Sequence, residues 1–463
     1  MTKSTSLFMC NSCGNEFPKW AGRCSACGEW NTLTEVTSLA RPSPRSSNSK
    51  SLPAGRQAQS LSPSEALSST TSQTFTSTIS ELDRVLGPGF TKGGVYLIAG
   101  QPGIGKSTLL TQLAISLSNQ PPLKLRGGEP DRAGVILYVC SEENPSQVAT
   151  RISRLTKKDT SHIQLLNTSS VDQISHQVLN LKSLPAGRQV QSLNLIIVDS
   201  IQSVFLESNP TTSGSLTQIR DSANALIQLA KSTNIPIILV GHVTKEGNLA
   251  GPKLLEHMVD TVLELSGDRQ NNLRILRSHK NRFGPTDEAG LFSMTANGLE
   301  EVTDPGKFLL EDRLPNSPGS VLTMIMEGTR PMIIEIQALV TSTPIPIPRR
   351  IAKGISTARL QLITAILTKH LHLPLADKDI FVNITGGLTV NEPGADLGIA
   401  LAIAGSVKEK TLPGKTVCFG ELGLLGEIRK VTFGDKREKE AKKLGYTTIL
   451  SPSSYRHIRE IRI

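Results

Sequence analysis

The residues with the clearest chemical role form a phosphate-binding loop. They fit the pattern GxxxxGK[ST] and comprise Gly100, Gln101, Pro102, Gly103, Ile104, Gly105, Lys106, Ser107 and Thr108. The apolar segment GVYLIA precedes them and TLLTQLAISL follows, which predicts the strand–loop–helix context that the motif requires. Backbone N–H groups would converge on the phosphates, Lys106 would neutralise the β and γ oxygens, and Ser107 would offer its hydroxyl to Mg²⁺. The motif therefore predicts binding of ATP with Mg²⁺.

Three later apolar segments end in residues that could complete this site. NLIIVDS ends near Asp199, at a strand end where a carboxylate can reach Mg²⁺. VILYVCSEENPSQ leads to Glu142 and Glu143, where a carboxylate could activate water for attack on the γ-phosphate. A solvated loop charge is the alternative for either glutamate alone. IPIILVGHVTKEG carries His242 at the carboxyl end of a strand, where α/β sheets bind ligands. We expect a sensing role for His242, with a structural histidine as the alternative.

Cysteines gather at the N-terminus in two CxxC pairs, each followed by glycine: Cys10, Cys13, Cys24 and Cys27. This pattern predicts a tetrahedral four-thiolate site, which suits zinc. Disulfides or redox pairs are the alternative, and a cytoplasmic chain disfavours them. We expect Trp20 and Trp30 to cover the metal. Cys140 and Cys418 lie in apolar segments and are interpreted as core residues.

Composition predicts a soluble protein of more than one domain. The chain has 463 residues, of which 38% are hydrophobic and 4% aromatic. No apolar run approaches the roughly 20 residues of a membrane span, and no signal peptide is evident, so we expect a cytoplasmic location. Net charge is +10, and residues 429–463 hold ten Lys/Arg against four Asp/Glu. A basic balance favours an anionic partner such as nucleic acid.

Composition also predicts five segments along the chain. They are a zinc module (1–36), a flexible Ser/Thr/Pro-rich linker (37–74), an α/β nucleotide-binding domain (75–300), a connecting segment (301–348) and a second α/β domain (349–463). The sequence SLPAGRQAQSL at 51–61 is repeated, with one substitution, as SLPAGRQVQSL at 183–193. We interpret both copies as insertions in exposed loops.

Several of these motifs together resemble a known family. ELDRVLGPGFTKGGVYLIAGQPGIGKSTLL, YVCSEEN, LIIVDSIQSV and LVGHVTKEGNLAGPKLLEHMVDTVLEL are similar to RecA-type ATPases. The four cysteines and the segment KNRFG narrow the resemblance to the RadA family of bacterial DNA repair proteins. The resemblance implies a RecA-like ATPase core and a hexameric ring like that of DnaB helicase. It also implies ATP-dependent action on single-stranded and branched DNA in homologous recombination, with a RecA-type recombinase as a partner. Glu142 matches the family's catalytic glutamate, because it stands five residues before Gln147.

The KNRFG motif comprises Lys280, Asn281, Arg282, Phe283 and Gly284. In RecA-type cores a Lys or Arg from one subunit can approach the γ-phosphate bound by its neighbour. On an extended segment Lys280 and Arg282 point to the same side, and Phe283 and Gly284 would anchor and turn the chain. A contact with DNA phosphate explains the same spacing, and a plain structural turn is the third interpretation.

Two polar loops are candidates for contact with DNA inside a ring. They span residues 207–221 and 244–253 and contain Arg220, Lys245 and Lys253, which could follow phosphates. Ordinary mobile loops are the alternative.

The C-terminal segment GLTVNEPGADLGIALAIAG resembles the Lon protease domain. That chemistry needs a serine nucleophile and a lysine base, but these positions correspond here to Asp396 and Arg437. We therefore expect a domain without peptidase activity that serves ring assembly and binds duplex DNA through a basic helix at 429–443.

The predicted protein is thus a zinc-containing, DNA-stimulated ATPase of α/β class, acting as a ring-shaped motor in branch migration or unwinding. A nucleotide-switched DNA-binding or loading factor that does not translocate is the first alternative. A Lon-type protease is the second, which Asp396 disfavours.

Overall fold

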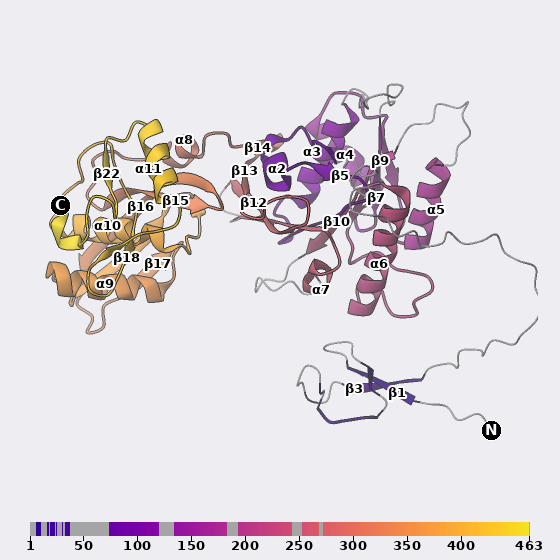
Figure 1. Ribbon diagram of the computed structural model, residues 1–463, viewed down its shortest axis with the longest axis horizontal. Coiled ribbons are helices and arrows are strands. Elements are labelled where there is room, and N and C mark those ends of the chain that lie inside the picture. The colour runs from indigo at the N-terminus through magenta and orange to yellow at the C-terminus, as the bar shows by residue number, and fades with distance from the viewer. Residues whose placement is uncertain are drawn as a thin grey trace, which may run out of the picture. The chain divides into compact units, whose positions relative to one another are not determined.

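The computed structural model describes residues 6–10, 16–17, 19–23, 25, 30, 33–37, 74–119, 134–182, 193–242, 252–267 and 272–462. The chain separates into two compact units, Met1–Thr71 and Ser72–Ile463. In the first unit, a small antiparallel sheet has the strand order β2-β1-β3, with β1 at Ser6–Cys10, β2 at Glu16–Phe17 and β3 at Leu33–Thr37 (Figure 1). Both copies of the SLPAGRQ text lie outside the described residues, except for the last residue of the second copy.

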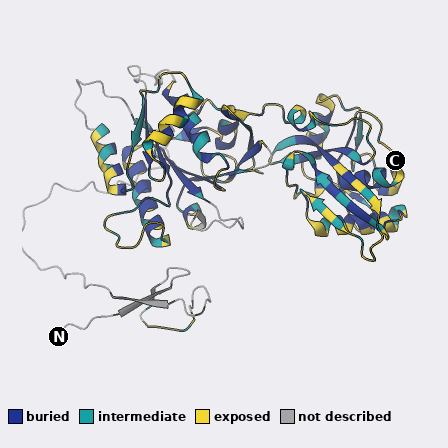
Figure 2. Cartoon of the chain, turned by 180° about the vertical axis from the view of Figure 1, so that it is seen from behind, coloured by how far each residue is buried: buried dark blue, intermediate teal, exposed yellow. Residues whose placement is uncertain are grey.

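The second unit begins with a nine-stranded sheet that positions the nucleotide-binding loop. Its order is β14 (Gly298–Glu301), β13 (Ala289–Thr295), β12 (Leu273–Asn281), β11 (Thr261–Ser266), β6 (Val95–Gly100), β10 (Ile237–His242), β9 (Leu193–Asp199), β7 (Val135–Cys140) and β8 (Ile163–Leu166). The six strands from β11 to β8 are parallel, and β12 to β14 extend the sheet antiparallel. The central parallel strands β6, β7 and β10 are almost wholly apolar and buried because helices cover both faces of the sheet. Figure 2 shows the central strands in the dark blue of buried residues, whereas the edge strand β8 is of intermediate burial.

Successive side chains of each strand point to opposite faces of the sheet, which divides the core into two layers. In β6, Tyr96 and Ile98 pack with α2 (Ser80–Leu86), α3 (Lys106–Ser118) and α4 (Pro145–Leu155). Val95 and Leu97 point to the other face, toward α5 (Val171–Lys182), α6 (Leu216–Thr233) and α7 (Pro252–Glu256). The carboxyl ends of the parallel strands therefore meet at one edge, between two helical layers.

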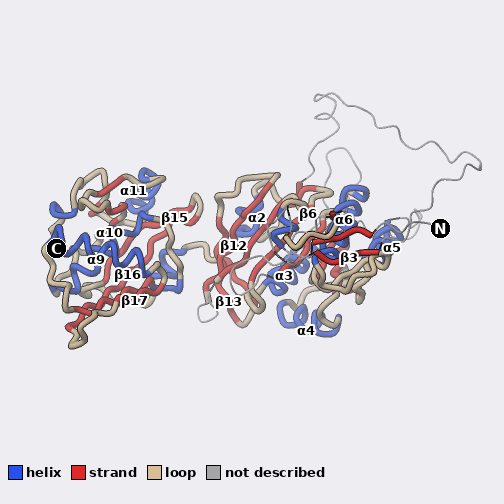
Figure 3. The backbone as a smooth tube through the Cα atoms, turned by 90° about the horizontal axis from the view of Figure 1, so that it is seen from below, coloured by secondary structure: helices blue, strands red, loops and turns tan. Residues whose placement is uncertain are grey.

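The second domain of this unit is built on a six-stranded sheet. Its order is β17 (Arg350–Lys353), β18 (Lys378–Ile384), β16 (Arg330–Ser342), β15 (Ser320–Glu327), β19 (Thr416–Cys418) and β22 (Thr448–Leu450). The helices α9 (Thr357–Leu371) and α10 (Asp396–Lys408) pack on one face, and α11 (Gly434–Lys443) packs on the other. Figure 3 shows these strands in red among the helices. Two further antiparallel pairs are formed by short strands. β4 (Thr74–Phe75) pairs with β5 (Phe90–Thr91), and β20 (Glu421–Leu422) pairs with β21 (Ile428–Arg429). The helix α8 (Pro305–Leu310) precedes β15.

The prediction of a connecting segment at 301–348 is wrong. β15 and β16 lie in that segment and form the middle of the second sheet, where they pair along eight residues each. The sequence PIPIPRR has the composition of a joint between domains, but it connects β16 to β17 inside one sheet. A Pro-rich loop between two strands and a Pro-rich linker share the same composition, so composition alone cannot separate them.

Within the described ranges, no helix has both the length and the apolar character needed to cross a membrane.

Candidate ATPase site

The loop between β6 and α3 has the backbone that a phosphate site needs. Gly103 and Gly105 have φ angles of 75° and 115°, which side chains disfavour. A Cβ atom at Gly100 would collide with the carbonyl oxygen of Leu265 on β11. The helix α3 begins directly at Lys106, so its unpaired N–H groups face the loop. The predicted strand–loop–helix context is confirmed.

Lys106 is buried at this loop and makes three polar contacts. Its Nζ atom donates to the carbonyl oxygens of Gly100 at 2.8 Å and Gln101 at 3.0 Å, and lies 3.1 Å from Nδ1 of His242. Burial lowers the pKa of Lys106 to about 8, although the carboxylates of Asp199 and Glu142 act in the opposite direction. The ammonium therefore lies in a poorly solvated place, where phosphate oxygens can replace two carbonyls as its partners.

Asp199 ends β9 beside the loop and is also buried. Tyr138 of β7 donates its hydroxyl to Oδ2 of Asp199 at 2.7 Å, and the hydroxyl of Ser107 bonds the same carboxylate. Burial raises the pKa of Asp199, and the two hydrogen bonds oppose that shift. A hydroxyl beside a carboxylate is a hard oxygen donor set, so Ser107 and Asp199 fit Mg²⁺.

The neighbouring glutamates after β7 have different partners. Oε2 of Glu142 accepts a hydrogen bond from Oγ of Ser200 at 2.8 Å and lies 3.2 Å from Nε2 of His242. Burial would raise the pKa of Glu142, but these two hydrogen bonds, together with the nearby charge of Lys106, outweigh it and lower the pKa. Glu143 instead forms an ion pair with Arg151 of α4, with 2.6 Å between Nη2 and Oε1. Glu142 therefore faces the loop as an ionised base, whereas Glu143 is engaged on the α4 side.

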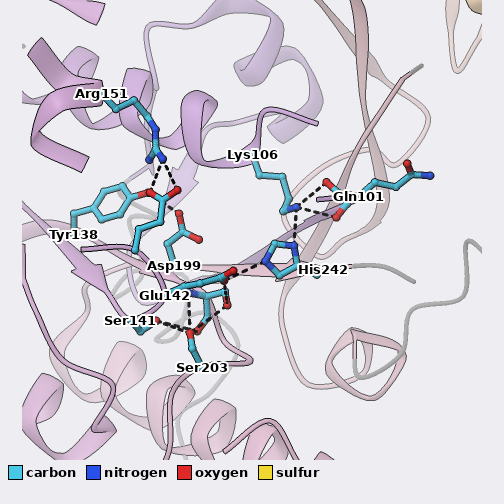
Figure 4. Close-up of polar contacts among 12 residues, drawn as sticks. Gln101, Lys106, Tyr138, Ser141, Glu142, Arg151, Asp199, Ser203 and His242 are labelled. Atoms are coloured by element: carbon cyan, nitrogen blue, oxygen red, sulfur yellow. Dashed lines mark hydrogen bonds and ion pairs between the residues drawn. The ribbon is translucent and has the colours of Figure 1, made fainter. Parts of the chain in front are cut away.

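His242 connects the two halves of the site, as Figure 4 shows. An ammonium has only hydrogens to offer, so Nδ1 of His242 accepts from Lys106 and Nε2–H donates to Glu142. The structure brings together four predicted groups, Lys106, Asp199, Glu142 and His242, at the carboxyl ends of four adjacent strands.

The KNRFG motif lies at the other end of β6. Asn281 pairs with Thr261, and Thr261 pairs with Tyr96 near the start of β6, whereas the phosphate-binding loop follows its end. Nζ of Lys280 donates to the carbonyl oxygens of Glu256 at 2.6 Å and Val259 at 2.9 Å.

The other KNRFG side chains contact the same region of their own chain. Nη1 of Arg282 is 3.1 Å from Oδ1 of Asp260, and the Asn281 amide donates to the carbonyl oxygen of Leu86 at 3.1 Å. The ring of Phe283 packs 5.9 Å from that of Tyr96. None of these described contacts reaches the phosphate-binding loop of the same chain.

The remaining predicted binding residues are placed only in part. Arg220 is exposed in α6 and pairs with Asp221 at 3.1 Å. Lys245 lies outside the described residues, and Lys253 lies in α7 with its side chain outside them. The thiols of Cys10, Cys13, Cys24 and Cys27 are also outside the described part, although the backbone of Cys10 ends β1.

The two positions that correspond to a protease dyad hold buried ion pairs. Asp396 pairs with Arg359 of α9. Arg437 is fully buried, bonds the Glu392 carboxylate through both Nη atoms at 2.9 and 2.5 Å, and donates to the carbonyl oxygen of Met324 at 2.6 Å. Each group is saturated by its partners, so neither is available as a nucleophile or a base.

Sequence reasoning missed several partners of the site, namely Tyr138, Ser200, Arg151, Arg359 and Glu392. Tyr138 carried one weak signal, since a tyrosine in a fully buried strand needs a partner for its hydroxyl.

Comparisons with known proteins agree with this architecture. Residues 61–248 match the family model of an AAA domain, residues 8–35 that of a rubredoxin metal binding domain, and residues 352–454 that of subunit ChlI of Mg-chelatase. The match at 8–35 spans all four N-terminal cysteines.

Solved structures were compared as well. One structure described as an ATPase domain aligns with a TM-score of 0.40 at 16% identity, over 52% of this chain and 95% of that one. A KaiC-like protein of Pyrococcus horikoshii OT3 aligns with a TM-score of 0.39 at 18% identity, over 50% of this chain and 99% of that one.

Sequence relatives cover nearly the whole chain. DNA repair protein RadA of Bacillus subtilis (strain 168) is 40% identical over 455 residues, which is 98% of this chain and 94% of that protein. RadA of Pseudomonas aeruginosa is 40% identical over 98% of this chain and 94% of its own length, and RadA of Escherichia coli (strain K12) is 40% identical over 96% and 92%. The chain therefore belongs to the RadA family of DNA repair proteins, with a RecA-like ATPase core, an N-terminal zinc ribbon and a C-terminal ChlI-like domain.

Proposed function

We propose that this protein is a DNA-stimulated ATPase that drives branch migration or unwinding of recombination intermediates as a homohexameric ring. One observation supports the ATPase activity: His242 contacts both Lys106 and Glu142. The same imidazole therefore links the group that binds phosphate to the candidate base. The membership of the RadA family supports DNA as the substrate.

The chemistry assigned to the site follows from its contacts. ATP phosphates replace the carbonyl oxygens of Gly100 and Gln101 and the Nδ1 atom of His242 as partners of Lys106. Mg²⁺, when bound by Ser107 and Asp199, would neutralise charge on the phosphates. Glu142 is ionised and takes a proton from the water that attacks the γ-phosphate. When Lys106 binds phosphate, His242 loses Lys106 as a hydrogen-bond partner. The imidazole can then change its position in response to bound nucleotide and transmit that change to the segment that follows β10.

We assign Lys280 and Arg282 to the ATP of a neighbouring subunit. Their position at the amino end of β6 supports this, because a group there cannot serve its own loop, and the Arg282 side chain is exposed. The guanidinium of Arg282 would spread charge over transition-state oxygens. In the resting chain both side chains are held by carbonyls and by Asp260, so they must exchange these partners when the neighbour binds ATP.

The other parts take supporting roles in this proposal. Cys10, Cys13, Cys24 and Cys27 hold zinc, and the module they stabilise contacts a RecA-type recombinase. The loops with Arg220, Lys245 and Lys253 follow single-stranded DNA, and the basic surface of α11 follows duplex DNA. The C-terminal domain has no peptidase activity and helps to assemble the ring. The protein would work in the cytoplasm.

The decisive experiment is ATP turnover with and without single-stranded DNA for wild type, Lys280→Ala and Arg282→Ala. A mixture of Lys106→Ala and Arg282→Ala subunits is included. If the site is shared, both single variants bind DNA but lose turnover, and the mixture regains part of it. If only the stimulation by DNA disappears, KNRFG belongs to the DNA path instead. A branch-migration assay on a labelled three-strand junction then separates a motor from a loading factor that hydrolyses ATP without translocating.

A further inference from the structure

The hairpin of β20 and β21 presents two leucines to solvent at its turn. Gly426 N donates to Gly423 O at 2.9 Å, so Leu424 and Leu425 occupy the two central turn positions. Their exposed fractions are 68% and 75%. Turn positions favour Gly, Asn, Asp and Ser, and two adjacent exposed leucines make no contribution to the core. Neither local structure nor packing explains them.

The backbone of this turn is held by two histidines from elsewhere in the domain and by the adjacent Glu427. Nε2 of His370, in α9, lies 3.0 Å from the carbonyl oxygen of Leu424. Nε2 of His457 lies 3.0 Å from the carbonyl oxygen of Leu425. The N–H group of Leu425 donates to Oε2 of Glu427 at 3.0 Å. The polar backbone atoms between the two leucines are therefore satisfied without solvent.

The two histidines are themselves fixed. Their rings meet edge to face with centroids 5.5 Å apart. Nδ1 of His457 accepts from the N–H group of Arg459 at 3.1 Å, and Nε of Arg459 donates to the carbonyl oxygen of His370 at 2.8 Å. Gly426 has φ +84°, and a Cβ atom there would lie 2.7 Å from Nε2 of His457. The turn is preorganised, so its backbone loses little conformational entropy when a ligand covers the leucines.

Basic residues are frequent on the elements that hold this turn, which selects the chemistry of the ligand. Exposed basic residues on the elements that hold it are Lys369, Arg429, Arg456, Arg459 and Arg462. Three carboxylates lie on the same elements: Glu421 on β20, Glu427, which bonds Arg429 and the turn, and Glu460, which accepts from the N–H group of Arg456 at 3.0 Å. The basic residues therefore outnumber them. A second copy of this chain, which carries a net charge of +10, fits such a surface less well than a polyanion.

We propose that Leu424 and Leu425 form an apolar wedge that contacts exposed bases at a DNA branch point, while the surrounding arginines contact the flanking phosphates. Nucleic acid combines an anionic backbone with apolar base faces, and apolar side chains are known to insert where stacking is already weak. A branch point offers such a step, and a continuous duplex does not. This inference rests on the proposed action on branched DNA and assigns a residue pair that would recognise the branch.

The test compares the double variant Leu424→Ser/Leu425→Ser with Leu362→Ser, which alters a 53% exposed leucine on α9 of the same domain. Binding is measured to a three-way junction and to a linear duplex of equal length, with 2-aminopurine at the branch point to report unstacking. We expect the double variant to lose about tenfold in junction affinity and most of the 2-aminopurine signal. Affinity for linear duplex and ATP turnover without DNA should be unchanged, and Leu362→Ser should behave as wild type.

Two results would overturn the wedge. One is an unchanged junction affinity and 2-aminopurine signal in the double variant. The other is a smaller assembly by light scattering, which would identify the turn as a contact between copies. If wild type itself does not distinguish the junction from linear duplex, the proposed branched substrate fails and the wedge, which requires a branch point, fails with it. A normal wild-type preference that the double variant retains overturns the wedge alone.

Discussion

The imidazole of His242 spans an intervening strand to reach Glu142, with 3.2 Å between its Nε2 atom and the carboxylate Oε2. His242 ends β10 and Glu142 follows β7, while β9 lies between these strands and carries Asp199. His242 and Glu142 therefore meet across the end of the strand that carries Asp199.

For His242→Ala we expect ATP turnover to fall about 100-fold with ATP affinity little changed, because the base loses the group that orients it. His242→Gln keeps a side-chain donor and should recover part of the rate. Steady-state turnover and equilibrium binding of a fluorescent ATP analogue measure the two effects. A weaker ATP affinity with normal turnover would instead mean that His242 acts by positioning Lys106 and not by orienting Glu142.

Substitutions of the two adjacent glutamates should have clearly different effects on ATP turnover. Glu142→Gln should reduce turnover about 1,000-fold while ATP still binds, since the amide cannot accept the proton of the attacking water. Glu143→Gln is the matched control, because it removes a carboxylate one residue away whose partner is Arg151. Comparable losses in both variants would contradict the assignment of Glu142 as the base.

Tyr138→Phe should weaken Mg²⁺ binding about tenfold or more, because the hydroxyl that fixes Oδ2 of Asp199 is lost. The measurement is the affinity for ADP as a function of Mg²⁺ concentration. Tyr96→Phe provides a control, since its hydroxyl is also buried but accepts from the N–H group of Thr91. Equal Mg²⁺ dependence in the two variants would show that the Tyr138 hydroxyl has no effect on the metal.

ATP binding should take up protons above pH 8. Burial lowers the pKa of Lys106 from 10.5 to about 8, so between these values the unfolded chain binds more protons and this group's contribution to stability rises with pH. Bound phosphates favour the charged form and reverse the shift. Calorimetry at pH 8.5 in buffers of different ionisation enthalpy should detect proton uptake that is absent at pH 6.5. Uptake of equal size at both values would mean that another group is responsible.

Arg437→Ala should lower the free energy of unfolding by about 3 kcal/mol, because it leaves the Glu392 carboxylate without its buried partner. Thermal unfolding monitored by circular dichroism measures the loss. Arg437→Lys should also be destabilising, since an ammonium cannot bond both carboxylate oxygens and the Met324 carbonyl in the same geometry. Neither variant should digest casein. Peptidase activity in Arg437→Lys would contradict the assignment of an inert domain.

Local sequence was sufficient where chemistry depends on consecutive residues. The loop from Gly100 to Thr108 combines its glycines, its lysine and its flanking segments within one stretch, and the structure has the expected strand, loop and helix. Asp199 and His242 were placed correctly at strand ends for the same reason, because each apolar strand stops at its polar residue.

Other features depend on which strands become neighbours. The order β10-β9-β7 decides that His242 faces Glu142 and that Tyr138 reaches Asp199. The pairing of β11 with β6 and β12 puts KNRFG at the far end from its own phosphate loop, and β15 with β16 turns an expected linker into the middle of a sheet.

The sequence by itself therefore determined the nucleotide loop, the strand-end carboxylates and the family, because local spacing sets backbone conformation. Spacing to Gln147 had singled out Glu142, but only the tertiary structure decided its partners Ser200 and His242 and the pairing of Glu143 with Arg151. The tertiary structure alone also decided that Asp396 and Arg437 are engaged in buried ion pairs. These contacts join residues far apart in the chain, and sheet order and register, which no local pattern encodes, bring them together.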